Sequence, residues 1–313
     1  MSNSDKQSNK FAWSHYEAID LKGKGRQETF TIRHLKQGST GAVSTWPVAS
    51  VLLDYLVLRN GLARKVPSVD TLNMADNSLQ QQESTDPLAA NDDNESYNIV
   101  ELGAGTGYLG IGLALSLNRE ANLSSKEDGV RFQPKVRVMC TDNDQRTIKN
   151  MRFNVMDQPK EGMLSKAVTV QNLAWGTDVG GTKFSNAIGS QFGSRQKNKS
   201  EKEEKEEDPL RLVTHLIASD VHYGVTTLDP LSSVISAFKL RNPNVVVIVL
   251  LKERSPEVYA DVTGLKAEIE SKVQSGLGDK ECSLDTQTAL KDFFVSVRDV
   301  IHHDITNMKM VEC

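Results

Sequence analysis

The sequence predicts an α/β protein with an open, mostly parallel β-sheet. A short apolar strand at residues 98–102 (NIVEL) leads into a glycine-rich turn and an apolar helix that runs through Leu117. Apolar runs alternate with segments of helical periodicity along much of the chain. Residues 245–251 (VVVIVLL) form an uninterrupted apolar run, which is typical of a central strand buried on both faces.

A strand and a helix are expected ahead of the glycine-rich turn. Residues 30–34 (FTIRH) alternate between apolar and polar side chains, which predicts a strand or one arm of a hairpin. A helix is expected to begin at Pro47, since proline favours the first helical position, with Thr45 or Trp46 as its cap. The apolar stripe of this helix consists of Val48, Val51, Leu52, Tyr55 and Leu56.

The alternation of strand and helix continues after the turn. A strand over residues 136–141 (VRVMCT) ends at Asp142-Asn143-Asp144, and residues 147–155 have the pattern of its crossover helix. Later strands are expected at 168–173, 212–218 and 245–251, with an antiparallel partner at 293–301. Ligands of such sheets bind beyond the carboxyl ends of the parallel strands, so functional residues are expected there.

Two polar stretches interrupt this pattern. Residues 65–97 are polar and acidic without a usable period, and residues 183–209 contain GSRQKNKSEKEEKEEDP, which mixes both signs of charge. Such segments bury too little apolar surface to offset the entropy of ordering, so both are predicted to be disordered insertions. The predicted organisation is an N-terminal extension over residues 1–29 and one domain over residues 30–313.

Composition narrows the partners and the compartment. The chain of 313 residues carries 37 basic and 41 acidic side chains, a net charge of −4, which argues against nucleic acid as a partner except through a local basic patch. Cys140, Cys282 and Cys313 have no metal-site or disulfide spacing, as expected in a reducing compartment. No stretch has the pattern of a secretion signal or the length of a membrane span. We expect a monomer in the cytoplasm, with the nucleus as a second location.

The glycine-rich turn is the first candidate for ligand binding. Gly103, Gly105, Gly107 and Gly110 follow a strand and open a helix, where glycine permits a sharp turn and close approach of a ligand to the backbone. Gly105-x-Gly107-x-x-Gly110 also matches the dinucleotide fingerprint. A glycine-rich turn without a ligand is the structural alternative.

Two acidic residues distinguish between the ligands that such a turn can hold. Glu101, at the strand end, would attract an ammonium group and repel a pyrophosphate. Asp142 is the acidic residue expected to hold a ribose, and it follows Gly107 by 142 − 107 = 35 residues, whereas a dinucleotide fold has about 20. Both features favour S-adenosylmethionine over a nicotinamide or flavin cofactor. Asp142 could instead cap a helix, although Asp144 is the better placed cap.

Five motifs stand in a fixed order at the predicted strand ends. They are GAVSTWPVAS around Trp46, ELGAGTGYLG at 101–110, Thr141-Asp142, LAWG at 173–176 and ASDVHY at 218–223. Together they resemble the seven-β-strand methyltransferases, and more narrowly methyltransferase family 16, the protein-lysine methyltransferases related to methyltransferase-like 21. The resemblance covers the chain from about Phe30 onward without the polar stretches. It implies a Rossmann-like, seven-stranded, mostly parallel sheet with one antiparallel strand and helices on both faces.

The resemblance also implies which residues bind the cofactor, S-adenosyl-L-methionine. The methionine part would run along the turn, Asp142 would bind the ribose hydroxyls, and Trp175 would lie beside the adenine. An aromatic face stabilises a sulfonium cation without attacking it, which suits an indole in the pocket. Core packing is the alternative for both tryptophans. The full predicted set is Trp46, Glu101, Gly103, Ala104, Gly105, Asp142, Trp175 and Ser219.

Asp220 and Tyr223 are the predicted catalytic residues. Asp220-Val221-His222-Tyr223 matches the acidic-x-x-aromatic motif that the family places next to the substrate. Both side chains would orient the acceptor amine, since methyl transfer to an unprotonated amine needs no metal and no dedicated base. The alternatives are a helix cap for Asp220 and lid packing for Tyr223.

The predicted function is therefore methyl transfer from S-adenosylmethionine to a lysine side chain of a protein substrate. A protein histidine or a small molecule is the alternative acceptor. An inert, partner-binding scaffold is disfavoured because Glu101, Asp142, Asp220 and Tyr223 are all present. A dehydrogenase is a more distant alternative. The sequence contains no Gly-x-Ser-x-Gly elbow, no Walker loop and no metal-ligand cluster.

Overall fold

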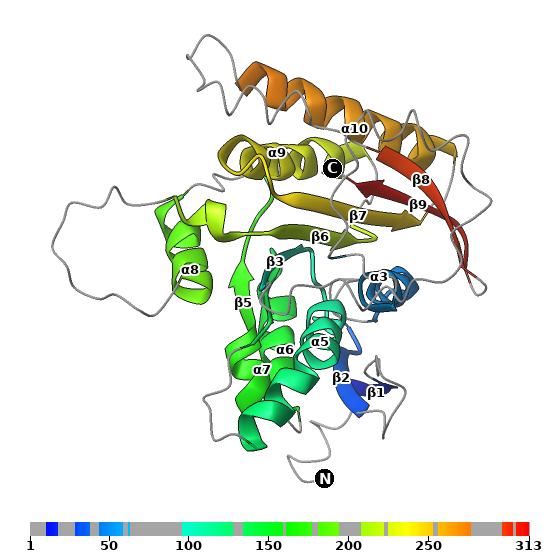
Figure 1. The fold of residues 1–313 in the computed structure, drawn as a ribbon. Coiled ribbons are helices and arrows are strands. Elements are labelled where there is room, and N and C mark those ends of the chain that lie inside the picture. Colours follow the sequence, from blue (N-terminus) through cyan, green and yellow to red (C-terminus); the bar gives the residue numbers. More distant parts are fainter. Residues whose placement is uncertain are drawn as a thin grey trace, which may run out of the picture.

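The computed structural model has an α/β fold with helices on both faces of a central sheet (Figure 1). It describes residues 11–17, 29–37, 44–58, 62, 96–127, 134–158, 161–176, 181–193, 208–221, 225–252, 256–276, 296–302 and 305–312. The predicted insertion at 65–97 lies outside the described residues up to residue 95. Its last residue, Tyr97, is buried in the first strand of the sheet.

Five neighbouring strands of the sheet are parallel to one another, as predicted. Their order is β5-β4-β3-β6-β7. Because β4 lies on one side of β3 and β6 on the other, the strand order changes direction beside β3, which leaves a crevice at its carboxyl end. The strands are β3 (Tyr97–Leu102), β4 (Val136–Asp142), β5 (Val168–Asn172), β6 (His215–Ser219) and β7 (Val246–Lys252).

One of these strands begins later than its sequence predicts. The apolar run at 212–218 suggests a single strand, but Pro209–Leu212 forms a short 3-10 helix, η2, with Pro209 at its first turn and Asp208 as its cap. β6 therefore begins at His215. The apolar residues before it are also buried: Leu210 belongs to η2 and Val213 follows η2 directly.

Two more strands lie beyond β7. β9 (Ile305–Glu312) pairs antiparallel with β7, and β8 (Ser296–His302) pairs antiparallel with β9. The segment expected as the antiparallel partner, 293–301, corresponds to β8 and lies one strand further out than the neighbour of β7. No sequence pattern predicts β9, because ITNMKMVE does not alternate cleanly between apolar and polar residues.

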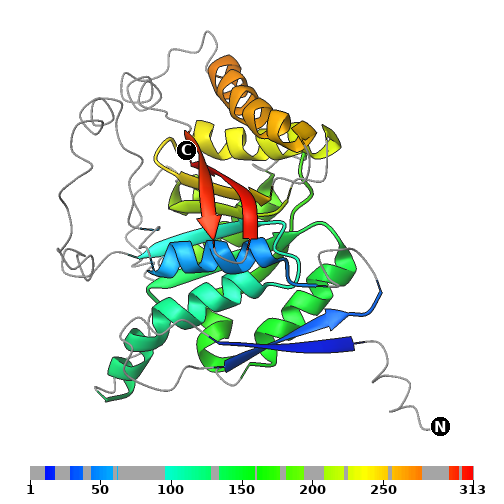
Figure 2. The same ribbon diagram turned by 90° about the vertical axis from the view of Figure 1, so that its right-hand side faces the viewer.

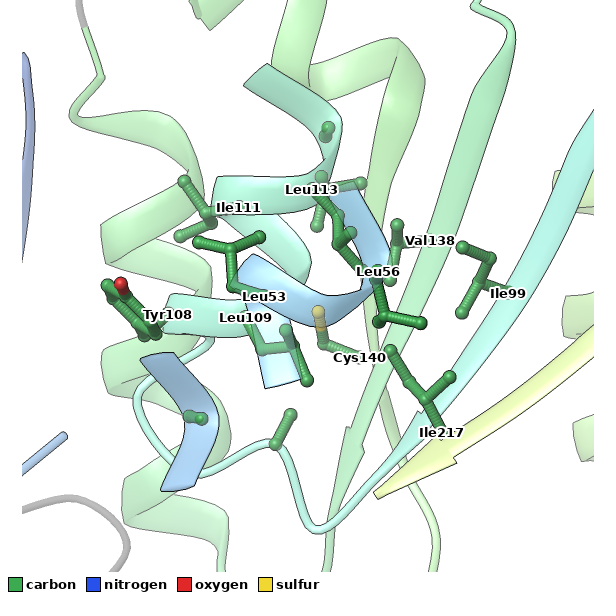
Figure 3. Close-up of a cluster of buried hydrophobic side chains, with 14 of the residues drawn as sticks. Leu53, Leu56, Ile99, Tyr108, Leu109, Ile111, Leu113, Val138, Cys140 and Ile217 are labelled. Carbon is green, nitrogen blue, oxygen red and sulfur yellow. The ribbon is translucent and has the colours of Figure 1, made fainter. Parts of the chain in front are cut away.

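Two apolar clusters cover the faces of the sheet. α3 (Pro47–Leu58), α5 (Tyr108–Glu127), α6 (Gln145–Met156) and α7 (Glu161–Ala167) contribute to one, and α8 (Thr182–Phe192), α9 (Val225–Arg241) and α10 (Pro256–Gly276) to the other. Successive strand residues alternate between them: Ile99 belongs to the first cluster and Val100 to the second. Figure 3 shows leucines of α3 and α5 gathered over Val138 and Cys140 in the first cluster.

The helix expected after Trp46 is confirmed. α3 begins at Pro47 and buries the whole predicted stripe together with Ala49, Leu53 and Val57. A helix that is apolar almost all round is suited to the space between a sheet and a second helix. None of the described helices is long and apolar enough to cross a membrane.

A pair of antiparallel strands, β1 (Phe11–Glu17) and β2 (Thr29–Leu35), packs beside this fold. It lies at the opposite end of the molecule from α9 and α10 (Figure 2). β2 confirms the strand or hairpin arm expected at 30–34. β1 and the first residue of β2 lie before residue 30, in the segment predicted to be an N-terminal extension.

Amide side chains at the end of α6 hold the outer edge of β2. Asn154 exchanges two hydrogen bonds with the backbone of Arg33, and Gln158 exchanges two with the backbone of Thr31, at 2.6 to 3.1 Å. These bonds replace those that a further strand would make, and the edge strand is thereby satisfied. The Asn154 amide also donates to the carbonyl of Thr106 at 2.9 Å, which connects β2 to the glycine-rich turn.

The insertion predicted at 183–209 is wrong over its first part. α8 covers Thr182–Phe192 and buries Phe184, Ile188 and Phe192 against the sheet. These three residues recur every fourth position, so they form one helical stripe that the polar composition of the stretch hides. Residues 194–207 lie outside the described residues.

Candidate active site

A pocket of about 350 Å³ opens at the carboxyl ends of β3, β4 and β6, where the strand order changes direction. This volume lies within the range of about 300 to 1,000 Å³ for small-ligand sites. Every residue predicted to bind the cofactor lines this pocket, although the residues come from separate segments of the chain. They are Trp46, Glu101, Gly103, Ala104, Gly105, Asp142, Trp175 and Ser219.

The backbone of the glycine-rich turn faces the pocket without a side chain at Gly103 and Gly105. Gly103 has φ of 66° and Gly105 has φ of 56°, a left-handed conformation that side chains other than glycine rarely adopt. A Cβ atom on Gly103 would lie 2.8 Å from Val221 Cγ1 and 3.1 Å from Trp175 Cζ2. Glycine at this position therefore lets Val221 and Trp175 approach the turn from the opposite wall.

Glu101 lies beneath the first turn of α5, and only 2% of it is exposed. Its Oε2 accepts a hydrogen bond from the Gly110 N–H at 3.1 Å and one from the Cys140 thiol at 3.4 Å. Burial raises the pKa of Glu101 to about 8, although both hydrogen bonds oppose the shift. The nearby Asp142 carboxylate adds to it. Near neutral pH the carboxyl group is mostly protonated while no cation lies beside it.

Asp142 connects the end of β4 to the glycine-rich turn. Its Oδ2 accepts from the Gly105 N–H at 3.1 Å, and its Oδ1 accepts from the Asp144 N–H at 3.0 Å. Burial raises the pKa of Asp142, and these hydrogen bonds oppose the rise. Asp144 is the cap of α6, since its carboxylate accepts from the Arg146 N–H at 2.8 Å. The prediction that Asp144 caps this helix is confirmed.

The two tryptophans reach the pocket from different elements. Trp46 directly precedes α3, and Trp175 follows β5 in the loop that leads to α8; both are half-buried. Trp175 also packs against the second apolar cluster, so its ring combines core packing with lining the pocket. The Oγ1 atoms of Thr45 and Thr106 lie 3.3 Å apart, and this hydrogen bond holds the segment before α3 against the glycine-rich turn.

The carboxyl end of β6 carries one of the two predicted catalytic residues. Ser219 and Val221 line the pocket, whereas Asp220 between them is buried and is not among the residues of its wall. Asp220 has φ of 52°, a left-handed conformation that aspartate tolerates better than most residues. Its N–H donates to the Leu250 carbonyl at 2.8 Å. Tyr223 lies outside the described residues.

Other residues of the pocket wall have no motif in the sequence. Thr226, Thr227 and Pro230 come from the first turns of α9. The available signal is topological, because a helix that follows a parallel strand begins at the ligand-binding edge of the sheet. Asn143 lies within the Asp-Asn-Asp sequence that ends β4, between the two acidic residues that the sequence singles out.

The wall combines carboxyl groups, hydroxyl groups, bare backbone and two indoles. Carboxylates suit an ammonium group and a ribose diol, and indole faces suit a sulfonium cation and an adenine ring. Within the part of the chain that the structure describes, no group of three or more His, Cys, Asp or Glu side chains could hold a metal ion.

The solved structures to which this chain shows a low similarity include several methyltransferases. A human methyltransferase 10 domain containing protein is 13% identical, with 85% of this chain and 93% of that chain covered and a TM-score of 0.38. A predicted O-methyltransferase from Agrobacterium tumefaciens is 14% identical, with 71% and 74% covered and a TM-score of 0.37. Aeropyrum pernix fibrillarin, solved with natively bound S-adenosyl-L-methionine, is 14% identical, with 70% and 66% covered and a TM-score of 0.29.

A family comparison gives the assignment. No curated protein matches the chain. The family model described as lysine methyltransferase matches residues 26–188, slightly more than half of the chain and the part that carries Trp46, the glycine-rich turn, Asp142 and Trp175. This match confirms the resemblance that the motifs indicate. The chain belongs to the lysine methyltransferase family and is an S-adenosylmethionine-dependent methyltransferase.

Proposed function

We propose that this enzyme methylates a lysine side chain of a protein substrate, with S-adenosylmethionine bound in the pocket at the carboxyl ends of β3, β4 and β6. One observation carries the proposal. Residues from separate segments of the chain, chosen from motifs alone, line one pocket of suitable size and chemistry. The narrower relation to methyltransferase-like 21 stays a prediction.

The wall offers a distinct partner for each part of the cofactor. Gly103, Ala104 and Gly105 would run along the methionine part, with the Glu101 carboxyl group near its ammonium group. Asp142 would bind the ribose hydroxyls and Trp175 would lie beside the adenine. The fit is supported by the turn itself, because Gly103 and Gly105 line the pocket with backbone that carries no side chain. When bound, the cofactor supplies a methyl group on a positively charged sulfur.

Asp220 and Tyr223 would act on the acceptor amine. A lysine ammonium has a pKa near 10.4, so deprotonation at neutral pH costs on the order of 4 kcal/mol. Partial desolvation at the pocket mouth lowers that pKa, and the proton can leave to water. The tight turn at Asp220 supports a positioning role, since left-handed non-glycine residues cluster at functional sites. Asp220 and Tyr223 would orient the remaining N–H groups of the amine.

Radiolabelled S-adenosylmethionine provides the direct test. Extract from a strain that lacks the gene is incubated with the enzyme, and the labelled band and residue are identified by gel and mass spectrometry. We expect a protein band labelled on lysine, and no band with Asp142→Ala, which would lose the ribose partner. Label on RNA alone, on a small molecule or on a histidine would overturn the proposed acceptor.

The remaining expectations concern organisation. We propose a seven-stranded sheet with β9 as the antiparallel strand, which the pairing of β9 with β7 and β8 supports. We also propose a monomer that acts on protein substrates in the cytoplasm and nucleus. The domain would include β1, since β1 pairs with β2 along its whole length.

A further inference from the structure

A second, open cavity of about 1040 Å³ lies between β2 and α6, outside the candidate active site. We call it the basic groove and define it by its five cationic side chains: Arg33, Lys36, Arg146, Lys149 and Arg152. Four apolar side chains also line it, Phe11, Leu35, Phe153 and Met156, together with the amides Gln37 and Asn150. The groove lies between β2 and α6, and the hydrogen bonds of the Asn154 amide hold these two elements together.

The charge of this groove is opposite to that of the chain as a whole. The described residues that line it include no acidic side chain, whereas the full chain has a net charge of −4. Asp157 is the carboxylate that acts on the Arg33 guanidinium, and it offsets only part of the positive charge. Cations that line one cavity repel one another unless an anion lies among them, so the groove is electrostatically complementary to a negatively charged partner.

Arg33 is held in place in the wall of the groove. Its guanidinium carbon lies 3.4 Å from the ring centroid of Phe153 and 4.3 Å from that of Phe11. Its Nε donates to the Asn150 side chain at 2.8 Å. A guanidinium held between rings and an amide loses little further freedom when it binds a carboxylate. Lys36, Lys149 and Arg152 are exposed around it.

The apolar part of the wall favours a peptide over a nucleic acid. Met156 is 62% exposed and Trp13, beside Phe153, is 47% exposed, so apolar surface is available next to the cations. Single-stranded nucleic acids bind by stacking bases on free aromatic faces. Here Arg33 lies against the rings of Phe11 and Phe153. Carboxylates together with apolar side chains match this surface better than bases do.

The basic groove also adjoins the cofactor pocket. Asn143 lines the pocket, and Arg146, three residues later in the first turn of α6, lines the groove. A chain segment bound in the groove would therefore lie near the ligand-binding edge of the sheet. We infer that the basic groove binds an acidic, partly apolar segment of the protein substrate and so helps to select it. This inference rests on the proposed function, because it takes the substrate to be a protein.

Fluorescence anisotropy with the full chain tests the groove without a methyl donor. The probe is a short labelled peptide of alternating glutamate and leucine, compared with a peptide that has glutamine for glutamate and with an oligouridine of matched length. We expect the glutamate peptide to bind most tightly. Lys36→Glu combined with Lys149→Glu should weaken its binding about tenfold or more. Lys183→Glu combined with Arg211→Glu, which changes net charge equally on exposed residues elsewhere, should alter it by less than about twofold.

Three results would overturn the inference. They are no measurable binding of the glutamate peptide, equal loss in both double variants, or tighter binding of oligouridine at the same groove. Calorimetry with S-adenosylmethionine on the same proteins separates this inference from the proposed function. We expect the groove variant to bind the cofactor like wild type and to need more protein substrate for half-maximal labelling, with an unchanged maximal rate. Absent cofactor binding in wild type would instead overturn the proposed function.

Discussion

The Gly110 N–H donates to the Glu101 carboxyl group at 3.1 Å, and this contact exists because residue 110 has no side chain. A Cβ atom at that position would lie 2.9 Å from Glu101 Oε2 and 2.4 Å from the sulfur of Cys140. Glu101, Gly110 and Cys140 therefore form one packed unit beneath the cofactor pocket. Glu101 is buried, yet it lines the cavity in which a cationic ligand would lie.

The first prediction is that binding of S-adenosylmethionine releases a proton. Burial raises the pKa of Glu101 to about 8, so the group is protonated at about pH 6.5 without ligand. An ammonium group beside it favours the carboxylate and lowers that pKa. Affinity should therefore rise with pH below about 8, by up to about tenfold per unit. Calorimetry in buffers of different ionisation enthalpy measures the released proton directly.

Glu101→Gln provides the control for this effect. Its amide keeps an oxygen that can accept from Gly110 but cannot titrate, so proton release should disappear and cofactor affinity should fall. Equal proton release by wild type and variant would show that another group is responsible.

The second prediction concerns stability against pH. Since the pKa of Glu101 is raised from 4.5 to about 8 in the folded protein, the folded state holds a proton that the unfolded state loses. The associated stability is complete below about pH 4.5 and is lost as pH rises through about 8. The loss amounts to a few kcal/mol in the free energy of unfolding, because one pKa unit corresponds to about 1.4 kcal/mol. Glu101→Gln should lack this loss.

Urea unfolding of both proteins at about pH 5 and about pH 8 measures the difference. Other groups titrate in this range, so the informative quantity is the wild-type loss minus the loss in the variant. A difference near zero would contradict the raised pKa.

Much of this site could be predicted because parallel topology brings distant motifs together. Glu101, Asp142 and Ser219 end or nearly end their strands, and neighbouring parallel strands place their carboxyl ends at one edge. Motifs at the carboxyl ends of neighbouring strands therefore predict that their residues lie close together in the folded protein. The same reasoning does not predict the positive φ angle of Asp220, because nothing in ASDVHY requires the left-handed backbone that the chain adopts there.

Other parts of the fold could not be predicted, because the burial of a residue depends on packing partners that the apolar periodicity of its own segment does not reveal. Asn150, Asn154 and Gln158 are polar, yet each is at least 95% buried because β2 lies over them. Their burial follows from a strand more than a hundred residues earlier in the chain. α8 shows the converse case, since three apolar residues suffice to pack one face of a helix that lies in a polar stretch of the sequence.

The third prediction is that Gly110→Ala destabilises the protein by about 1 to 3 kcal/mol, as overpacking of a tight core does. The added methyl group must displace the Cys140 sulfur and the Glu101 carboxyl group, which belong to residues only 0% and 2% exposed. Thermal or urea unfolding measures the change. Gly264→Ala on α10 is the matched control, because the one described neighbour that its Cβ would meet is Leu228, at an ordinary 3.7 Å.

The control should be neutral or stabilised by up to about 1 kcal/mol, since alanine favours a helix more than glycine does. Equal unfolding midpoints for the two variants would mean that the space around Gly110 is less tightly filled than the contacts indicate.

The fourth prediction separates cofactor binding from methyl transfer. Asp220 lies beside the pocket without forming its wall, whereas Asp142 forms the wall and accepts from Gly105. Asp220→Asn should therefore leave the affinity for S-adenosylhomocysteine within about twofold and lower the transfer rate at saturating cofactor by about a hundredfold or more. Asparagine is the informative substitution, because it keeps the shape of aspartate and tolerates φ of 52°, which alanine does not.

Asp142→Asn should have the opposite signature, with affinity reduced and the rate at saturating cofactor less affected. The two variants together test the division of labour between the ends of β4 and β6. If Asp220→Asn weakened cofactor binding as much as transfer, Asp220 would act by holding the end of β6 in place, through the bond from its N–H to Leu250, and not by orienting the acceptor amine. If Asp220→Asn reduced neither cofactor affinity nor the transfer rate, the turn at residue 220 would matter to transfer only through its backbone.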